Sequence, residues 1–135
     1  MVQVREVMTR PATTIQARAA LTEVLRLMEA GGFRHLPVID TSGALVGILT
    51  DRDLAHRATG PMGFLEARER RDALASIEAY EVMTDSPVSV PGDARLRDAA
   101  RLMLDKRVSC LPVVDDGAVV GILTSTDVLR HIAAG

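Results

Sequence analysis

Aromatic residues, cysteines and surplus positive charge are all scarce in this chain of 135 residues. Aromatic side chains make up only 2% of the sequence and the formal net charge is −2, so little is available to stack on bases or to neutralise a phosphate backbone. We therefore expect no nucleic-acid partner. The single cysteine, Cys110, excludes an internal disulfide and a multi-cysteine metal site, and a cytoplasmic, reducing location is the default expectation.

Long apolar runs are also missing. No segment approaches the roughly 20 apolar residues that cross a bilayer. Residues 1–6 lack the apolar core of a signal peptide, so we expect no membrane partner. What is present is an ordinary globular balance, with 47% hydrophobic and 25% charged residues. A chain of this length suits one compact domain, or two small units that share a core.

The most informative feature of the sequence is an internal repeat. Three short motifs occur twice in the same order: EVMT at 6–9 and 81–84, LPVID at 36–40 with LPVVD at 111–115, and GILT at 47–50 and 121–124. Segments that share these motifs at matched spacing are expected to share one fold. A unit of about 55 residues buries too little surface to be stable alone, so we expect the two copies to cover each other's apolar faces.

Each copy has the pattern of a β-α-β-β-α unit. In the first copy the pattern predicts a strand at 12–16, a helix with the apolar stripe Leu21, Val24, Leu25 and Met28, and strands at 36–39 and 45–49. The second copy repeats it, with a strand at 87–90 and Asp93 as the expected N-cap of its first helix. The predicted fold is therefore mixed α/β (α+β), with two such units related by pseudo-two-fold symmetry. Their predicted bounds are 1–58 and 80–135, joined by a connector at 59–79.

The connector lies outside the repeat. Residues 59–63 combine glycine and proline, which end a helix, and residues 64–79 predict a further helix with a mixed-sign charge run. A solvated linking helix is the simpler interpretation of this charge run. The alternative is a partner-docking segment centred on Met62, Phe64 and Leu65.

The duplicated pattern resembles the cystathionine-β-synthase (CBS) domain family. The resemblance rests on h-P-V-h-D before a turn and G-h-h-T-x-x-D after it, where h is hydrophobic, and it covers about residues 4–58 and 79–133. It implies a stand-alone CBS pair, or Bateman module, which is a non-catalytic regulatory sensor. Such a pair would bind AMP, ADP, ATP or S-adenosylmethionine in clefts between its repeats, with no cofactor. It would associate as a homodimer of pairs and act on an unidentified regulated protein.

The Thr-x-x-Asp segments at 50–53 and 124–127 carry the expected chemistry. Each follows a predicted strand and opens a predicted helix, where unpaired backbone N–H groups attract phosphate. An ionised carboxylate at Asp53 or Asp127 can accept both hydroxyls of a ribose, and the hydroxyl of Thr50 or Thr124 can donate to a phosphate or sugar oxygen. The same residues also fit a capping box, in which they satisfy helix-end donors, and the sequence does not separate the two roles.

The resemblance also implies how the binding residues group. The base would lie against the first strand and the residues before the proline of one repeat, while the other repeat supplies the aspartate and the phosphate contacts. One site would combine Asp53, Thr50, Arg52 and His35 with Val88, Val108 and Ser109, and the other Asp127, Thr124 and Thr126 with Thr13, Phe33 and Arg34. Where the first repeat has Arg52 and His35, the second has Thr126 and Cys110. The second repeat lacks a cation at these places, so we expect the Asp53 site to hold phosphate better.

Two other interpretations compete with the sensor. One is a structural or oligomerisation module, in which the threonines and aspartates only cap helices. The other is an enzyme acting on a nucleotide, which we do not expect because no nucleophile, general-base pair or metal cluster is evident. No metal is expected at His35, since no second histidine lies at ligand spacing. We also expect Met8 and Met83 to pack at the start of each unit.

Overall fold

The structure is a computed structural model that describes residues 1–59 and 66–135. These residues form two compact units. The first-repeat unit comprises residues 13–42 and 46–86, and the second-repeat unit comprises residues 1–12, 43–45 and 87–135. Each unit has its own sheet and its own buried core.

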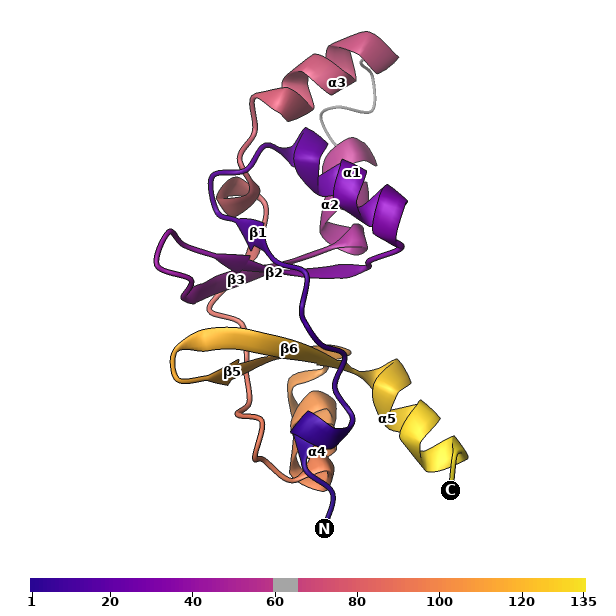
Figure 1. Ribbon diagram of the computed structural model, residues 1–135. Helices are drawn as coiled ribbons and strands as arrows, with labels where there is room; N and C mark the ends of the chain where they lie inside the picture. The colour runs from indigo at the N-terminus through magenta and orange to yellow at the C-terminus, as the bar shows by residue number, and fades with distance from the viewer. Residues whose placement is uncertain (60–65) are drawn as a thin grey trace. The chain divides into compact units, whose positions relative to one another are not determined.

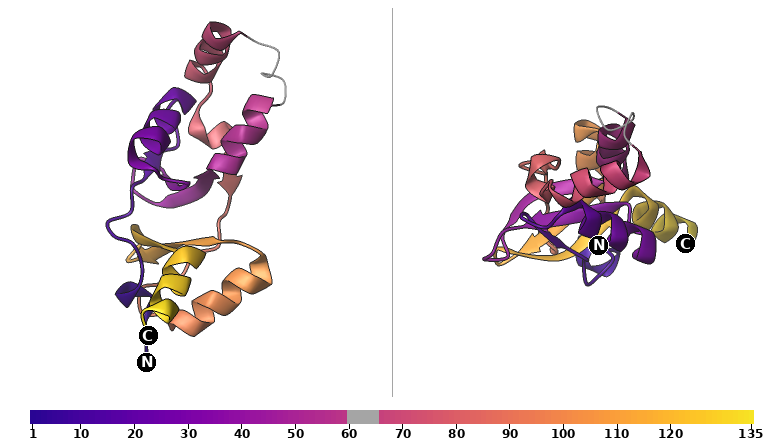
Figure 2. Two further views of the ribbon diagram at one scale, coloured as in Figure 1. Left: turned by 90° about the vertical axis from the view of Figure 1, so that its right-hand side faces the viewer. Right: turned by 90° about the horizontal axis from the view of Figure 1, so that it is seen from above.

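The first-repeat unit is built on a four-stranded sheet in the order β1-β2-β3-β4. Its elements in chain order are β1 (Ile15–Gln16), α1 (Leu21–Gly31), β2 (His35–Ile39), β3 (Leu45–Thr50), α2 (Asp51–Thr59), α3 (Ala67–Ala75), a 3-10 turn η3 (Ala79–Glu81) and β4 (Thr84–Asp85). Strands β1 and β2 are parallel, and β3 and β4 are antiparallel. Helices α1 and α2 lie on the same face of this sheet (Figure 1; Figure 2, left).

The second-repeat unit has the same topology. Its elements are a 3-10 turn η1 (Val4–Glu6), α4 (Leu96–Lys106), β5 (Cys110–Asp115), β6 (Ala118–Thr124) and α5 (Ser125–Ala133). Strands β5 and β6 are antiparallel. A parallel bridge from Val90 to Val113 stands where β1 pairs with β2, and an antiparallel bridge from Thr9 to Ile122 stands where β4 pairs with β3. The predicted β-α-β-β-α order is therefore confirmed in both copies.

The compact units do not coincide with the sequence repeats, because the two copies exchange their first segments. The start of the chain belongs to the second-repeat unit, where the N–H of Val4 donates to the carbonyl oxygen of Ala94 at 2.8 Å. The start of the second copy belongs to the first-repeat unit, where the N–H of Ala79 donates to the carbonyl oxygen of Ala19 at 2.8 Å. Val4 and Ala79 are both 0% exposed. The units predicted at 1–58 and 80–135 thus describe the repeat in the sequence, whereas each compact core uses residues from both copies.

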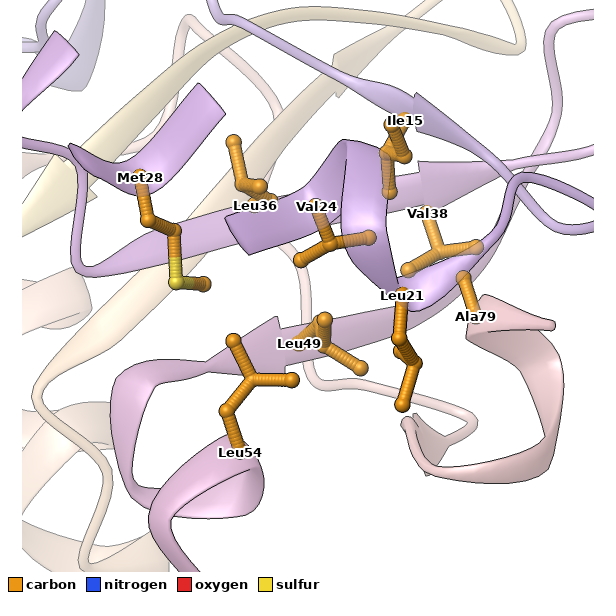
Figure 3. Packing of buried hydrophobic residues seen from close by; sticks show 9 residues of the cluster. All are labelled: Ile15, Leu21, Val24, Met28, Leu36, Val38, Leu49, Leu54 and Ala79. Atoms are coloured by element: carbon orange, nitrogen blue, oxygen red, sulfur yellow. The ribbon is translucent and has the colours of Figure 1, made fainter. Parts of the chain in front are cut away.

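Each core consists of the predicted helix stripe packed on the buried strands. In the first-repeat unit, Leu21, Val24 and Met28 of α1 point toward residues of β2 and β3, as Figure 3 shows. The equivalent stripe of α4, which comprises Leu96, Ala99 and Met103, packs in the second core. Close packing extends to the backbone: a Cβ added to Gly47 would stand 2.2 Å from the sulfur of Met83, and one added to Gly121 would stand 2.6 Å from the sulfur of Met8. The two methionines therefore pack as expected in kind, but each lies in the unit of the other repeat, Met8 in the second-repeat unit and Met83 in the first-repeat unit.

Several predicted boundaries were wrong at the helix starts and strand ends. Asp93 is not the N-cap of α4. That position is held by Arg95, and the N–H of Leu96 donates to the carbonyl oxygen of Val2 at 2.9 Å. The exchanged segment thus satisfies a helix-start donor that we had assigned to a carboxylate. The predicted first strands shorten to β1 in one copy and to the bridge at Val90 in the other.

The connector differs from its prediction in length and burial. Helix α3 covers Ala67–Ala75 rather than 64–79, and it contacts α1. Leu74 and Ile77 pack against the first core, so this end of the connector is not a purely solvated helix. The residues of the alternative docking segment, Met62, Phe64 and Leu65, lie outside the described residues.

Candidate functional site

The two Thr-x-x-Asp segments lie where a central strand runs directly into a helix. Thr50 ends β3 and Thr124 ends β6, and the next residue in each case begins α2 or α5. No loop intervenes, so the helix-start N–H groups lie next to the last residue of a buried strand. The sequence predicted both junctions correctly.

Both segments form reciprocal capping bonds. In the first-repeat unit, the N–H of Asp53 donates to Oγ1 of Thr50 at 3.2 Å, and the N–H of Thr50 donates to Oδ2 of Asp53 at 2.9 Å. In the second-repeat unit, the N–H of Asp127 donates to Oγ1 of Thr124 at 3.1 Å, and the N–H of Thr124 donates to Oδ2 of Asp127 at 2.9 Å. The capping role is therefore present in both copies. It leaves one carboxylate oxygen of each aspartate outside the box, so the cap does not preclude a ligand.

The two carboxylates differ in burial and in their other partners. Asp127 is 6% exposed, whereas Asp53 is half-buried. The hydroxyl of Thr9 donates to Oδ1 and Oδ2 of Asp127, at 3.2 and 3.4 Å, and the guanidinium of Arg130 lies 3.7 Å from Oδ1. Thr9 was not among the residues predicted from the sequence. The signal available was its recurrence in the second copy as Thr84, in a motif that we assigned to packing.

The residues before each proline lie beside the Thr-x-x-Asp segment of the same unit. The carbonyl oxygen of Arg34 accepts the N–H of Asp51 at 3.0 Å. The carbonyl oxygen of Ser109 accepts the N–H of Ser125 at 2.9 Å. In the second-repeat unit, Cys110 is the direct ladder partner of Thr124. The pre-proline residues and the aspartate of one repeat thus form one cluster at one end of each sheet.

Burial decides the protonation of His35 and Cys110, which stand two positions before the strand prolines Pro37 and Pro112. Burial lowers the pKa of His35, an effect that the carboxylate of Asp51 opposes and the guanidinium of Arg34 reinforces. Burial, together with the carboxylate of Asp127, raises the pKa of Cys110 to about 12. At neutral pH the imidazole is therefore mainly uncharged and the thiol stays protonated. The positive charge in this cluster therefore comes from the arginines rather than from His35.

The remaining predicted residues fall at the same ends of the sheets. Thr13 precedes β1 and Val88 precedes the bridge at Val90, and both are half-buried, as is Val108. Arg52 and Thr126 are exposed on the first turns of α2 and α5. These positions let each side chain face solvent or a ligand from the unit to which it belongs.

Phe33 is placed by a glycine. A Cβ on Gly31 would lie 2.1 Å from a carbon of the Phe33 ring, so the ring occupies the space that a larger residue would fill. The ring is 37% exposed and lies against the end of α1, which Gly32 terminates with φ of +68°. A glycine is required at Gly31 to bring the aromatic ring this close to the helix, and one is favoured at Gly32 by the left-handed conformation.

A groove lies away from these clusters, on the second-repeat unit. It has a volume of about 510 Å³ and runs between the start of the chain, α4 and α5, where it is lined by Met1, Val2, Leu96, Arg97, Ala100, Arg101, Leu104, Val128 and Ile132. Leu104 and Ile132 are 78% and 67% exposed. This surface was not predicted from the sequence, although apolar residues occur near the end of each of these two helices.

The described residues contain neither a candidate metal cluster nor a helix able to cross a membrane. Within 1–59 and 66–135, no group of three histidine, cysteine or acidic residues is arranged to hold a metal ion. Over the same residues, no helix has both the length and the apolar character needed to cross a bilayer.

Solved structures with this fold include complexes with adenosine compounds. The CBS domain pair of the protein MJ0100, solved with 5-methylthioadenosine and S-adenosyl-L-methionine, has a TM-score of 0.83 and 27% identity, with 99% of this chain and 98% of that chain covered. The protein CBSX2, solved with AMP, has a TM-score of 0.80 and 30% identity, with 99% and 98% covered. Another structure of CBSX2, from Arabidopsis thaliana, has a TM-score of 0.82 and 31% identity, with 98% and 94% covered.

Sequence relatives give the same family. A CBS domain-containing protein of Dictyostelium discoideum is 32% identical over 95% of this chain and 89% of its own length. A homoserine O-acetyltransferase of Methanohalophilus mahii is 31% identical over 98% of this chain, but the match covers only 25% of that enzyme. The sequence model described as "CBS domain" matches residues 4–60 and 79–134. The chain belongs to the CBS domain family and contains two copies of the domain.

Proposed function

We propose that this protein is a non-catalytic regulatory sensor that binds an adenosine-containing ligand, namely AMP, ADP, ATP or S-adenosylmethionine. One observation carries the proposal. Both repeats place a carboxylate and a hydroxyl at the start of a helix, beside the residues that precede a strand proline. A carboxylate suits the two hydroxyls of a ribose, and a helix start suits a phosphate. The similarity to CBS pairs solved with adenosine compounds supports the same ligand class.

Each ligand would use residues from both repeats. In the first proposed site, Asp53 accepts the ribose hydroxyls, while Thr50, Arg52 and His35 face the phosphate, and the base lies against Val88, Val108 and Ser109. In the second, Asp127, Thr124 and Thr126 act with Thr13, Phe33 and Arg34, and Cys110 stands in the place of His35.

A melting screen against AMP, ADP, ATP, S-adenosylmethionine, NAD and GTP tests the proposal. A ligand at 100 times its Kd stabilises the folded state by about 2.7 kcal/mol, which for a domain of this size raises Tm by several degrees. We expect a rise with at least one adenosine compound, and its loss in the double variant Asp53→Ala/Asp127→Ala. No rise with any adenosine compound would overturn the sensor, and turnover of ATP with magnesium would overturn the non-catalytic part of the proposal.

The first proposed site should hold phosphate more tightly than the second. Arg52 stands on the first turn of α2, whereas the matching position on α5 is Thr126. A contact between a phosphate and an arginine is about twice as strong as one between neutral groups. We expect a crystal soaked with AMP to show the nucleotide beside Asp53. Density beside Asp127 alone would contradict this ranking.

The groove on α4 and α5 favours a second candidate function, that of an oligomerisation module. Its apolar residues are exposed on a single chain, and we propose that a second copy of this chain covers them to form a homodimer. Light scattering coupled to gel filtration should report a dimer for the parent. It should report a monomer for Ile132→Glu, while Leu129→Glu, which changes an exposed residue of α5 outside the groove lining, serves as the matched control. A monomeric parent would overturn this assignment.

A further inference from the structure

The hydroxyl of Thr9 donates a hydrogen bond to the carboxylate of Asp127 in the second-repeat unit. It lies 3.2 Å from Oδ1 and 3.4 Å from Oδ2, and Oδ2 also accepts the N–H of Thr124. Arg130 approaches Oδ1 from the exposed side, at 3.7 Å. Both oxygens of this carboxylate therefore have partners within the protein, and a ribose hydroxyl would need the same acceptor positions.

The backbone holds Thr9 in this place. The N–H of Thr9 donates to the carbonyl oxygen of Ile122 at 2.9 Å, and the N–H of Ile122 donates to the carbonyl oxygen of Thr9 at 3.0 Å. This bridge sits two residues before Thr124 on β6. Thr9 itself is exposed, whereas the carboxylate that it contacts is 6% exposed. The threonine thus stands between solvent and Asp127.

The first-repeat unit has the same bridge without the same contact. Thr84 pairs with Ile48 in the register in which Thr9 pairs with Ile122. In the parts of the chain that the structure describes, however, no hydrogen bond joins the side chain of Thr84 to Asp53. Asp53 is also only half-buried. One carboxylate is therefore held by an internal hydroxyl and its counterpart is not.

We propose that Thr9 is a specificity-determining residue, whose hydroxyl substitutes for a sugar hydroxyl at Asp127 and makes this site the weaker of the two. This inference rests on the proposed function, because it assumes that the aspartates accept a ribose. Binding at Asp127 requires the Thr9 hydroxyl to turn away from the carboxylate. The Asp53 site needs no such step, so it fills first.

The test compares two variants of the full chain in which Asp53→Ala removes the stronger site. Adenosine is the probe, because it carries the sugar without a phosphate and so isolates the aspartate contact. Asp53→Ala/Thr9→Val should bind adenosine about tenfold more tightly than Asp53→Ala, which is the change expected when an acceptor is released from a bond of this kind. Valine keeps the β-branched shape that suits the bridge to Ile122 and removes only the donor. The matched control, Asp53→Ala/Thr84→Val, should bind as Asp53→Ala does.

Thermal melting separates the outcomes. Thr9→Val should lower Tm without ligand, because Asp127 loses a donor, and should enlarge the rise in Tm on adding adenosine. A lower Tm with unchanged adenosine affinity would show that Thr9 is only structural and would overturn the inference, while the sensor would stand as long as the parent binds. No adenosine binding by the parent or any variant would overturn both. If Thr9→Val does not fold, Thr9→Cys, a near-isostere with a weak donor, must show the same gain, and Thr9→Ser must behave as the parent.

Discussion

The two Thr-x-x-Asp segments, at the starts of α2 and α5, share a motif and a capping box but differ in environment. Both aspartates accept the N–H of their threonine at 2.9 Å, so the local hydrogen bonding is the same. Asp127 is buried and additionally accepts the Thr9 hydroxyl, while Asp53 is half-buried. A duplicated motif therefore fixes the local geometry, whereas the availability of its carboxylate for a ligand depends on neighbours that come from other parts of the chain.

The largest expected loss of stability comes from placing a carboxylate in one of the exchanged segments. Val4 and Ala79 occupy matching places, each 0% exposed in the core of the unit to which it has been exchanged. An unpaired carboxylate at either place is expected to cost more than about 3 kcal/mol, because it would be buried without a partner. We therefore expect Val4→Asp and Ala79→Asp to unfold already at low urea concentration, without a cooperative transition.

Arg10→Asp is the control for this experiment. Arg10 is exposed in the same segment and lies outside the groove lining, so its substitution should leave the urea midpoint nearly unchanged. A Val4→Asp variant that unfolds no more easily than Arg10→Asp would contradict the position of the chain start in the second-repeat unit.

A smaller effect separates the two aspartates. Asp127→Ala removes the acceptor of a backbone N–H and of the Thr9 hydroxyl, whereas Asp53→Ala removes only the capping acceptor. We expect a loss of about 2 kcal/mol for Asp127→Ala and about 1 kcal/mol for Asp53→Ala in the free energy of unfolding. Urea denaturation of the ligand-free protein measures both. Equal losses would mean that Thr9 contributes nothing to the stability of the second-repeat unit.

The smallest effect concerns the residues before the prolines. Because burial lowers the folded-state pKa of His35 below the unfolded value of about 6.5, the unfolded chain takes up a proton first as the solution is acidified. Stability should therefore be fully present above pH 6.5 and fall as the pH drops through the folded-state pKa. In His35→Gln, the urea midpoint should vary less with pH between pH 8 and pH 5 than it does in the parent.

The matching cysteine supplies the control for the pH series. Cys110 has a pKa of about 12, so its thiol does not titrate in this range. Cys110→Ala should shift the whole stability profile without changing its slope. An unchanged acid slope in His35→Gln would assign the pH dependence to other groups.

The sequence predicted most of the local structure because that structure follows from local rules. The apolar spacing of Leu21, Val24 and Met28 specified the buried face of α1. The Thr-x-x-Asp motifs specified their own caps. Asp93 failed as an N-cap because a residue distant in sequence, Val2, supplies the acceptor for the helix start.

What the sequence could not supply were the contacts between distant segments. The bond from Thr9 to Asp127 joins residues at opposite ends of the chain, and no periodicity within either copy announces it. The pKa of Cys110 likewise depends on its depth in the second-repeat unit rather than on its neighbours in sequence. The bond from Thr9 arises from the exchange of first segments, which the repeat alone would place with the wrong unit.

That exchange suggests how the connectivity of the polypeptide could be changed. Residues 13–86 contain the whole first-repeat unit, interrupted only by residues 43–45, whereas the other unit is drawn mainly from both ends of the chain. Met1 and Ile132 line the same groove, so the two ends approach each other there. A circular permutant that links the last residue to Met1 by a short flexible loop and opens the chain after Ala12 would place residues 87–135 and 1–12 in one continuous stretch. Apart from residues 43–45, each half of such a chain would be built from consecutive residues.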